Sequence, residues 1–508
     1  MSLNPEPSAP DERAVQDLPP KSYADAAEEA LEPDSHAANH TDGTLEHAGQ
    51  RQRQRQRAKA DQVRPNGIRI PSADDKDSLE GVGMDSSPKS PTVKGHRRVA
   101  SRSSHGSLGR KHGEHVAHEL YEKHQNGNGD ALTSVKPPQE LDRVGRTDAL
   151  KRRNSELKSG RQAGAGWARS KIRFAPMNVP LQRRLQTLAV LMHTLSIVGG
   201  LAIFFFLCSI PLLWPILLPY TVYVLFSNAG TSGELSLRSE RLRRLPVWSL
   251  FASYFPARLH RSQELEPTRK YIFGYHPHGI ISHGAFAAFA TEALGFSQLF
   301  PGITNALLTL DSNFRYPIYR EYALRLGMAS VSRESCENLL SKGGPNGEGM
   351  GRAITIVVGG ARESLDARPG TVRLVLRRRK GFVKMAIRTG ADLVPVLAFG
   401  ENDVYDQLDG KSHPYVHKFQ MLVKKVMGFT IPIFHARGIF NYDVGMMPYR
   451  RPINIVVGRP IRVVQNKHPD TEYLDQVHDQ YINELMRIWN EHKDTFAKHR
   501  TGELEIVE

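Results

Sequence analysis

The stretch YIFGYHPHG, residues 271–279, decides the fold of the region around it. Its first five residues form an apolar run typical of a strand, and a segment of small residues, 280–293, follows the motif. His276 and His278 are therefore expected in a turn between a strand and a helix, the position at which open α/β sheets bind ligands. Imidazole can act there as a general base, whereas a surface pair or a metal-binding pair is the competing interpretation.

Apolar runs that end in glycine-containing turns alternate with helical patterns on both sides of this stretch. The pattern predicts strands at 354–358, 393–399 and 453–457, and helices at 321–326 and 381–389. Such alternation predicts an α/β fold, a mixed sheet flanked by helices. The last helix is expected over 471–493 and to pack on the sheet through one apolar stripe: Leu474, Val477, Tyr481, Leu485 and Ile488.

The segment that follows the histidines, 280–310, is unusually rich in large apolar residues: Phe286, Phe289, Leu294, Phe296, Leu299 and Phe300. Some of these side chains are expected in the core. Others are expected to face lipid, so that the site would open at a membrane surface.

Residues 1–165 differ in composition from the rest of the chain. Before Trp167 the aromatic residues are Tyr23 and Tyr121 alone, and a segment this poor in large apolar residues cannot offset the entropy lost on ordering. We expect a mostly disordered, basic and polar tail. The formal net charge of the whole chain is +15. No nucleic-acid-binding motif accompanies this charge, so anionic lipid headgroups and a phosphorylated co-substrate are the expected partners rather than nucleic acid.

The longest uncharged segment lies between Arg184 and Glu234. Its apolar core is long enough for two spans or one deep hairpin, and we predict a membrane hairpin over 185–228. One helix is expected from about Leu185 to Ile210, followed by a proline-rich bend and a second helix to about Phe226. Both flanks are basic, which favours two cytosolic ends, and Cys208 within this run argues against a disulfide framework.

Three further groups of residues are candidates for the site. The basic cluster Arg373, Arg377, Arg378, Arg379, Lys380 and Lys384 can bind phosphates or form a solvated basic face. Gly359 and Gly360 follow a predicted strand and either let backbone amides approach a ligand or form an ordinary tight turn. Glu363 is either a ligand of a substrate hydroxyl or a salt-bridge partner.

Several motifs in order along the chain carry a resemblance to one family. They are Tyr254-Phe255-Pro256, the HPHG motif, P-x-x-R-E-Y at 317–322, G-G-x-x-E at 359–363, R-x-G-F-x-K-x-A-x-x-x-G-x-x-L-V-P-x-x-x-F-G-E at 379–401, and G-x-P-I at 458–461. The chain resembles the type-2 diacylglycerol acyltransferase family, membrane enzymes that include monoacylglycerol and wax-alcohol acyltransferases. The likeness covers about residues 180–500 and leaves the polar tail outside it.

The resemblance implies a glycerolipid-acyltransferase-like fold with a cytosol-facing catalytic domain over 235–500, at the endoplasmic reticulum membrane and the lipid droplet surface. It implies transfer of an acyl group from acyl-CoA, a co-substrate rather than a bound cofactor, to diacylglycerol. The lipid bilayer is a further partner, and a homo-oligomer stays open. Expected substrate-binding residues are Gly359, Gly360, Arg320, Arg377, Arg378, Arg379 and Lys384; expected catalytic residues are His278 as base, His276 and Glu363.

Related glycerolipid acyltransferases carry an acid five positions after the catalytic histidine, but His283 stands five positions after His278. The orienting group is therefore expected to be a backbone carbonyl or Glu363. Alternatives stay open: a monoacylglycerol or long-chain alcohol as acceptor, a metal enzyme with His276, His278 and His283 as ligands, or a non-enzymatic protein that tethers or shapes membranes. Of these alternatives the metal enzyme is not preferred, and we expect no metal site.

Overall fold

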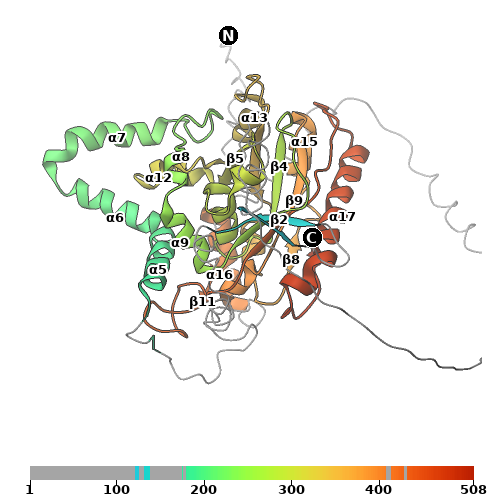
Figure 1. The fold of residues 1–508 in the computed structure, drawn as a ribbon. Coiled ribbons are helices and arrows are strands. Elements are labelled where there is room, and N and C mark those ends of the chain that lie inside the picture. Colours follow the sequence, from blue (N-terminus) through green and yellow to red (C-terminus); the bar gives the residue numbers. More distant parts are fainter. Residues whose placement is uncertain are drawn as a thin grey trace, which may run out of the picture. The chain divides into compact units, whose positions relative to one another are not determined.

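The computed structural model describes residues 120–124, 131–137, 174–175, 179–407, 414–427 and 432–507. A nine-stranded sheet within this part of the chain has the order β1-β2-β3-β12-β9-β4-β7-β5-β6 (Figure 1). Its strands are β1 (Tyr121–His124), β2 (Leu132–Val135), β3 (Arg258–Arg261), β4 (Tyr271–His276), β5 (Thr304–Thr309), β6 (Ala329–Ser330), β7 (Arg352–Val357), β9 (Asp392–Phe399) and β12 (Asn454–Val457). The predicted mixed α/β sheet is confirmed.

The five neighbouring strands β9, β4, β7, β5 and β6 are parallel, and β12 joins this group antiparallel to β9. Strand β4 lies at the middle of the sheet, with Tyr275 opposite Val357 of β7 on one side and Val396 of β9 on the other. The chain segments that follow β9, β4 and β7 therefore begin at one edge of the sheet.

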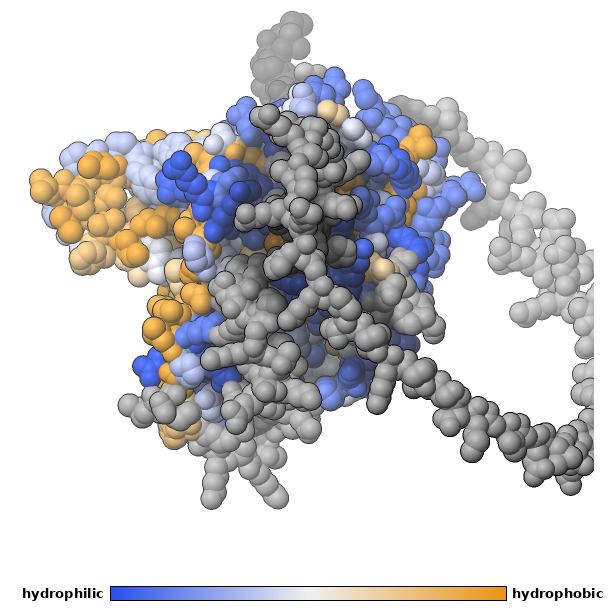
Figure 2. Space-filling model, viewed as in Figure 1, coloured by the Kyte–Doolittle hydropathy of each residue, from blue (hydrophilic) through white to orange (hydrophobic). Residues whose placement is uncertain are grey.

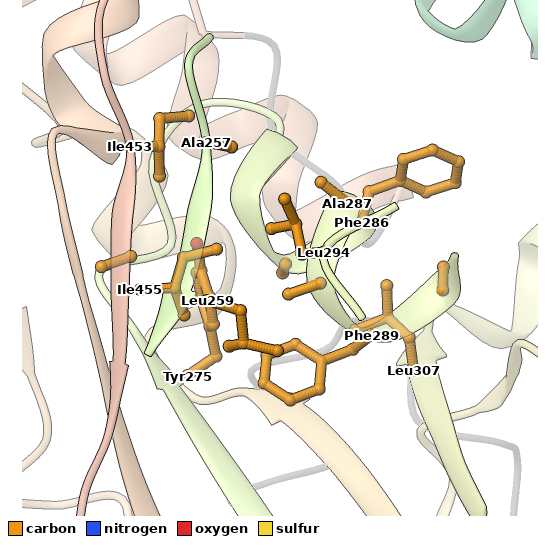
Figure 3. Close-up of a cluster of buried hydrophobic side chains, with 14 of the residues drawn as sticks. Ala257, Leu259, Tyr275, Phe286, Ala287, Phe289, Leu294, Leu307, Ile453 and Ile455 are labelled. Carbon is orange, nitrogen blue, oxygen red and sulfur yellow. The ribbon is translucent and has the colours of Figure 1, made fainter. Parts of the chain in front are cut away.

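Helices cover the two faces of the sheet, because β4 is apolar on both sides and its side chains alternate between two cores. Ile272 contributes to the core under α13 (Arg333–Ser341), α15 (Gly381–Thr389) and α17 (Thr471–Phe496). Tyr271, Phe273 and Tyr275 contribute to the core under α9 (Pro246–Tyr254), the π-helix η2 (Phe286–Ala290) and α11 (Phe296–Leu299), part of which is drawn in Figure 3.

Helix α17 confirms the amphipathic pattern at the end of the chain. All five stripe residues, Leu474, Val477, Tyr481, Leu485 and Ile488, are buried. They belong to the core that α17 shares with β9 and α15. The stripe is thus a packing surface, as the sequence predicts.

The expectation that some of the six large apolar side chains of 280–310 face lipid is wrong. Phe286, Phe289, Leu294, Phe296, Leu299 and Phe300 are all buried. The physical reason is the aromatic face of β4: the Phe273 ring lies 5.5 Å from Phe289, 5.9 Å from Phe296 and 6.0 Å from Phe300, centroid to centroid. These rings fill the sheet–helix interface and leave none of the six for a membrane.

Strands β1 and β2 fall within the range 1–165, where the sequence predicts a disordered tail. They form an antiparallel pair, and Thr133 and Ser134 of β2 pair with β3. The alternation in Leu-Thr-Ser-Val buries Leu132 and Ser134, and Asn126-Gly127 in the sequence between the strands is a hairpin signal. Before residue 174 the structure describes only 120–124 and 131–137, so the rest of the tail prediction lies outside the described residues.

The remaining elements of the described residues are short or lie at the edges of the sheet. They are α8 (Glu240–Arg243), α10 (His283–Ala285), η3 (Asp311–Arg315), α12 (Tyr319–Arg325), α14 (Gly360–Ser364), η4 (Glu401–Val404), α16 (Pro414–Met427), and the strand pairs β8 (Arg373–Val375) with β13 (Glu505–Val507) and β10 (Asp406–Gln407) with β11 (Phe434–His435). Ordered structure thus continues to β13, past residue 500.

The segment predicted as a membrane hairpin has three helices, α5 (Leu181–Thr194), α6 (Ser196–Cys208) and α7 (Trp214–Phe226), with the short helix η1 (Pro211–Leu213) at the proline-rich bend. A single helix from Leu185 to Ile210 is wrong, because α5 and α6 meet at a bend of 68°. The hydroxyls of Thr194 and Ser196 donate to the carbonyls of Val190 and His193 at the bend. Such bonds compete with the helix ladder and bend helices.

Helices α5 and α7 differ in their surroundings. Gln186, Ala189 and Val190 of α5 are buried against α9, so this helix belongs to the globular part on one face. The arm made by α6 and α7 exposes large apolar side chains, which Figure 2 shows as the orange region at the upper left: Phe205, Phe206, Leu212, Ile216 and Phe226 among them. Among the described residues no single helix reaches the length and apolarity of a span, and only the bent pair α5–α6 does so together.

Candidate active site

Three turns at one edge of the sheet build the site. They follow the neighbouring strands β9, β4 and β7, and they carry Glu401, the HPHG motif and the Gly359-Gly360 pair with Glu363. Strand β4 ends at His276 and α10 begins at His283, so His278 lies in the predicted turn between a strand and a helix, whereas His276 is the last residue of the strand. Parallel strands thus bring together residues that are 125 positions apart in the sequence, from His276 to Glu401.

His278 is half-buried, and its ring is held by the backbone of its own turn. Nδ1 lies 3.0 Å from the carbonyl oxygen of Gly279. Because a carbonyl can only accept, Nδ1 carries the hydrogen, and Nε2 is left with its lone pair. Nε2 has no hydrogen-bond partner among the described residues. Burial lowers the pKa of His278 below the ordinary histidine value, so the ring is neutral at neutral pH.

His276 is fully buried and has a different environment. Its Nε2 lies 2.9 Å from the hydroxyl of Tyr481 on α17, and that hydroxyl donates to the carbonyl of Gly274 at 3.1 Å. The hydroxyl hydrogen is thus used, so Nε2 of His276 donates to the Tyr481 oxygen. Burial, together with nearby His478, lowers the pKa of His276 to about 3. The neutral ring joins β4 to α17.

Glu363 holds the histidine turn by its backbone rather than by an imidazole. One carboxyl oxygen accepts the backbone N–H of His278 at 2.5 Å and the other that of Val375 at 2.9 Å. Burial raises the pKa of Glu363 to about 7, although these bonds and the charge of Arg379 act in the opposite direction. Of the two expected orienting groups, the backbone carbonyl of Gly279 therefore bonds to the His278 ring, whereas Glu363 bonds to the backbone N–H of His278.

The glycine pair after β7 fits closely around this carboxyl. A Cβ on Gly359 would lie 2.1 Å from the Glu363 carboxyl carbon, so no side chain can be placed there. Gly360 has a φ of +59°, the left-handed region that glycine adopts without strain. Both glycines serve the turn that folds Glu363 toward His278, which is the tight-turn interpretation of the pair.

Glu401 is a buried carboxyl of the site that sequence reasoning missed. One oxygen accepts the hydroxyl of Tyr275 at 2.7 Å and the backbone N–H of Gly284 at 2.9 Å, and the other oxygen has no partner in the described part of the chain. A Cβ on Gly279 would lie 2.8 Å from the Glu401 Cγ, so the side chain packs directly on the histidine turn. Burial raises its pKa to about 7. The signal was present, since Glu401 ends the long motif at 379–401.

His283, the third ligand of the metal hypothesis, is separated from the other two histidines by its contacts. Its Nε2 lies 2.8 Å from the hydroxyl of Tyr405, and its ring stacks on Phe255. Burial lowers its pKa well below the ordinary value. His276 and His283 thus turn to different tyrosines, and within the described ranges no group of three His, Cys, Asp or Glu residues is arranged as a metal site.

The predicted phosphate-binding residues divide by exposure. Arg377 and Arg378 are exposed in the turn between β8 and α15, and Lys384 is half-exposed on α15. Arg379 is buried and its charge acts on Glu363. Two members of the wider cluster are in ion pairs: Arg373 with Asp366 and Glu505, and Lys380 with Asp475 at 2.5 Å.

Arg320, the remaining predicted substrate-binding residue, is buried in α12 with partners in the hairpin. Its guanidinium donates to the carbonyl of Val224 at 2.8 Å and to the hydroxyl of Ser227 at 2.6 Å, and lies over the Tyr223 ring. The next residue, Glu321, accepts the hydroxyl of Tyr220 at 2.7 Å. The R-E-Y part of the motif thus anchors α7, and no described contact joins Arg320 to the histidine turn.

The similarity to known proteins covers the part of the chain that contains this site. Residues 205–507 match the family model described as diacylglycerol acyltransferase. Diacylglycerol O-acyltransferase 2A of Umbelopsis ramanniana is 50% identical over 340 residues, which cover 66% of this chain and 94% of that protein. Diacylglycerol O-acyltransferase 1 of Schizosaccharomyces pombe is 45% identical over 322 residues, 63% of this chain and 91% of that protein.

A relative with a different printed acceptor is nearly as similar. The 2-acylglycerol O-acyltransferase 1 of Bos taurus is 43% identical over 333 residues, 64% of this chain and 97% of that protein. Among solved structures, the 1-acyl-sn-glycerophosphate acyltransferase of Thermotoga maritima aligns with 61% of this chain and 97% of its own, at 12% identity and a TM-score of 0.30, a score that supports no conclusion. The family-model match spans more than half of the sequence, and the chain therefore belongs to the diacylglycerol acyltransferase family.

Proposed function

We propose that this protein is a diacylglycerol O-acyltransferase, which transfers the acyl group of acyl-CoA to the free hydroxyl of diacylglycerol and yields triacylglycerol and CoA. The observation that carries this function is the 50% identity to the Umbelopsis ramanniana diacylglycerol O-acyltransferase over 94% of that protein. The family match over residues 205–507 includes the whole histidine turn and both buried carboxyls.

His278 is the general base of the reaction. An alcohol is a poor nucleophile at neutral pH, and its proton must leave as the oxygen attacks the thioester carbonyl. The free lone pair on Nε2 takes this proton while Nδ1 stays bonded to the Gly279 carbonyl. The oxygen–carbon bond forms, the carbon–sulfur bond breaks, and the imidazolium returns the proton to the CoA thiolate, so the ring is neutral again after each turnover.

The lowered pKa of His278 has a clear consequence for this role. The neutral ring is favoured at neutral pH, so the base is ready to accept a proton. His276 has no such role, because its Nε2 is bonded to Tyr481 within the core. It is a structural residue that fixes the end of β4 against α17.

Glu363 and Glu401 are positioning residues that clamp the turn from two sides. Glu363 fixes the backbone N–H of His278, and Glu401 joins the end of β4 to the start of α10 across Gly279. A small displacement of a base from its reacting atom costs large factors in rate, so a rigid turn is part of the catalytic apparatus.

The exposed residues Arg377 and Arg378 and the half-exposed Lys384 bind the phosphates of acyl-CoA. Guanidinium groups suit bidentate phosphate contact, and Lys384 adds a point charge. Support comes from their exposure close to Arg379, whose charge reaches Glu363 and so links the basic turn to the histidine turn.

The arm formed by α6 and α7 enters the membrane as a re-entrant hairpin with both ends on the cytosolic side. Each helix has 13 residues, a length of roughly 20 Å, whereas the hydrocarbon core is about 30 Å thick. Neither helix therefore crosses the bilayer, and the bend at η1 lies within it. This placement, at the endoplasmic reticulum and lipid droplet surface, would bring diacylglycerol from the membrane to the site.

An acceptor assay tests the function. The purified full chain in vesicles receives one labelled acyl-CoA together with diacylglycerol, 2-monoacylglycerol or a long-chain alcohol. We expect diacylglycerol to be esterified with the highest kcat/KM. Faster esterification of 2-monoacylglycerol would favour a second candidate function, monoacylglycerol acyl transfer. The 43% identity to the 2-acylglycerol O-acyltransferase of Bos taurus supports this candidate. Absence of ester formation with all three acceptors would refute acyl transfer.

A further inference from the structure

A second apolar surface lies more than 200 residues along the chain from the hairpin. Residues 438–446, here called the apolar loop, expose Ile439, Phe440, Val444 and Met446, with Phe440 77% and Met446 70% exposed. Phe174, 73% exposed, is bridged to Asn441 of this loop. Exposed apolar side chains that gather in one place mark an interaction surface.

The apolar loop is a built structure rather than an irregular excursion. Arg437 and Met447 exchange backbone hydrogen bonds at 2.9 and 2.8 Å, and Ala436 donates to the carbonyl of Gly445 at 2.7 Å. The side chain of Asn441 accepts the N–H groups of Asp443 and Val444 inside the loop. These bonds hold the backbone, so the apolar side chains are presented outward at little further cost in conformational entropy.

Hydrogen bonds join the apolar loop to the segment that precedes α5, and join the chain just after the loop to α5 itself. Ala175 donates to the carbonyl of Phe440 at 2.8 Å, and Arg450 donates to the side chain of Gln186 at 2.6 Å and the carbonyl of Arg183 at 2.9 Å. Helix α5 itself exposes an apolar stripe at helical spacing: Leu181, Leu185, Leu188 and Met192. Orange patches interspersed with blue lie at the left of Figure 2 below the arm, where Figure 1 labels α5.

The charge around this surface is one-sided. Asp443 is the single acidic residue between Gly410 and Pro469, and it is fully buried. Exposed basic side chains in these parts of the chain include Arg184 on α5 and Lys418 on α16, and α16 also exposes Tyr415, Phe419 and Leu422. Apolar and aromatic side chains among Lys and Arg are the pattern of protein segments that lie in a membrane interface with anionic headgroups.

We propose that the apolar loop and the exposed stripe of α5 form a second membrane contact, which rests on the headgroup region of the bilayer into which the hairpin inserts. The occupant is lipid because the surface combines apolar area with basic side chains, and because Arg450, just after the apolar loop, is bonded to α5, the helix that leads into α6. The protein would then be held at two places, and this contact would fix the tilt of the catalytic domain. The proposal rests on the membrane placement given above but not on acyl transfer.

Lipid contact at Phe440 can be measured directly in the full chain. Phe440→Cys is labelled with an environment-sensitive fluorophore and reconstituted into phosphatidylcholine–phosphatidylserine vesicles. The vesicles are prepared with or without lipids whose acyl chains carry a quencher close to the headgroup. Cys208→Ser serves as the background, and Cys336 does not react because burial raises the pKa of its thiol to about 12. Blue-shifted emission that the quencher lipids reduce is the expected result.

Two matched positions make the outcome unambiguous. Phe206→Cys on α6, 67% exposed, reports the hairpin, and Val464→Cys, 74% exposed before α17, is the solvent control. Quenching at 206 without quenching at 440 would overturn the second contact and leave the hairpin and the acyl-transfer function standing. A blue shift at 440 that quencher lipids do not reduce would also overturn it, because protein, the tail or a second copy, would then cover the loop.

Discussion

The two imidazoles of the turn after β4 stand two residues apart and have opposite environments. His276 donates to Tyr481 in the core, whereas His278 keeps a free lone pair at a half-buried position. The HPHG pattern predicts the turn and both candidate bases, but it cannot assign them. That assignment depends on Tyr481, which α17 brings from 205 positions along the chain.

Glu401 provides a pH-dependent prediction. Burial raises its folded-state pKa from 4.5 to about 7, so folding favours the protonated carboxyl. Its contribution to stability is complete below about pH 4.5 and is lost as the pH rises through about 7. Glu401→Gln stays neutral and keeps one oxygen that accepts from Tyr275 and Gly284. The fall in melting temperature from pH 5 to pH 8 should therefore be smaller for Glu401→Gln than for wild type. Ionisation of Glu401 lowers the free energy of unfolding of wild type by at most about 3 kcal/mol.

The exposed Glu472→Gln on α17 is the matched control for this experiment, and it should follow the wild-type curve. Thermal melting in detergent at both pH values measures all three proteins. An equal loss of melting temperature in wild type and Glu401→Gln would contradict a buried carboxyl that titrates near neutral pH.

Helix α12 holds α7 and α5 through three consecutive side chains. Arg320 and Glu321 bind α7, and the Tyr322 hydroxyl lies 3.1 Å from Nδ1 of His193 on α5. The sequence resemblance implies a substrate-binding role for Arg320. Its partners could not be deduced from the motif, because they come from a segment about 95 residues earlier in the chain.

Arg320→Ala distinguishes the two roles of this residue. Loss of a buried, multiply bonded guanidinium leaves the Val224 carbonyl and Ser227 without a partner, which should cost about 1–3 kcal/mol and lower the melting temperature. The KM for acyl-CoA should stay within about twofold, or roughly 0.4 kcal/mol, of wild type. Arg333→Ala, an exposed ion-pair partner on α13, is the control. A raised KM at an unchanged melting temperature would instead make Arg320 a substrate ligand.

The basic turn between β8 and α15 gives a prediction of the opposite kind. Arg377→Ala with Arg378→Ala removes two exposed charges without touching the core, so the melting temperature should not change. The KM for acyl-CoA should rise by about tenfold, equal to about 1.4 kcal/mol, and the rise should shrink at high salt. Arg315→Ala, 61% exposed on η3, controls for the loss of surface charge. An unchanged KM would show that the turn is a solvated face.

At the scale of the whole molecule, sequence-based predictions are confirmed where the local pattern and the burial of side chains agree. Helix α15 spans 381–389 and α17 contains the predicted 471–493, because each has a clear apolar stripe and a distinct end. The α/β alternation predicts the sheet, but not its order, since pairing of β4 with β7 and β9 depends on contacts about 80 and 120 residues apart.

Failures of sequence reasoning occurred where apolar composition alone was interpreted as a membrane signal. The segment 280–310 is rich in large apolar residues, yet three of its rings, those of Phe289, Phe296 and Phe300, pack on Phe273. Helix α5 looks continuous with α6, yet polar Gln186 is buried and hydroxyls bend the chain after His193. Hydropathy does not show which partner an apolar face has, and the apolar loop, short and interrupted by polar residues, gives no hydropathy signal.

The rate of triacylglycerol formation by His278→Ala, measured in vesicles beside wild type, tests the central claim most directly. Within the described residues the His278 ring bonds only to the carbonyl of its neighbour, so its loss should leave melting temperature and vesicle binding unchanged. The exposed His468→Ala controls for loss of an imidazole. We predict a fall in kcat by a factor of about 10²–10⁴. A folded, membrane-bound His278→Ala protein that works at the wild-type rate would contradict the assignment of His278 as the base.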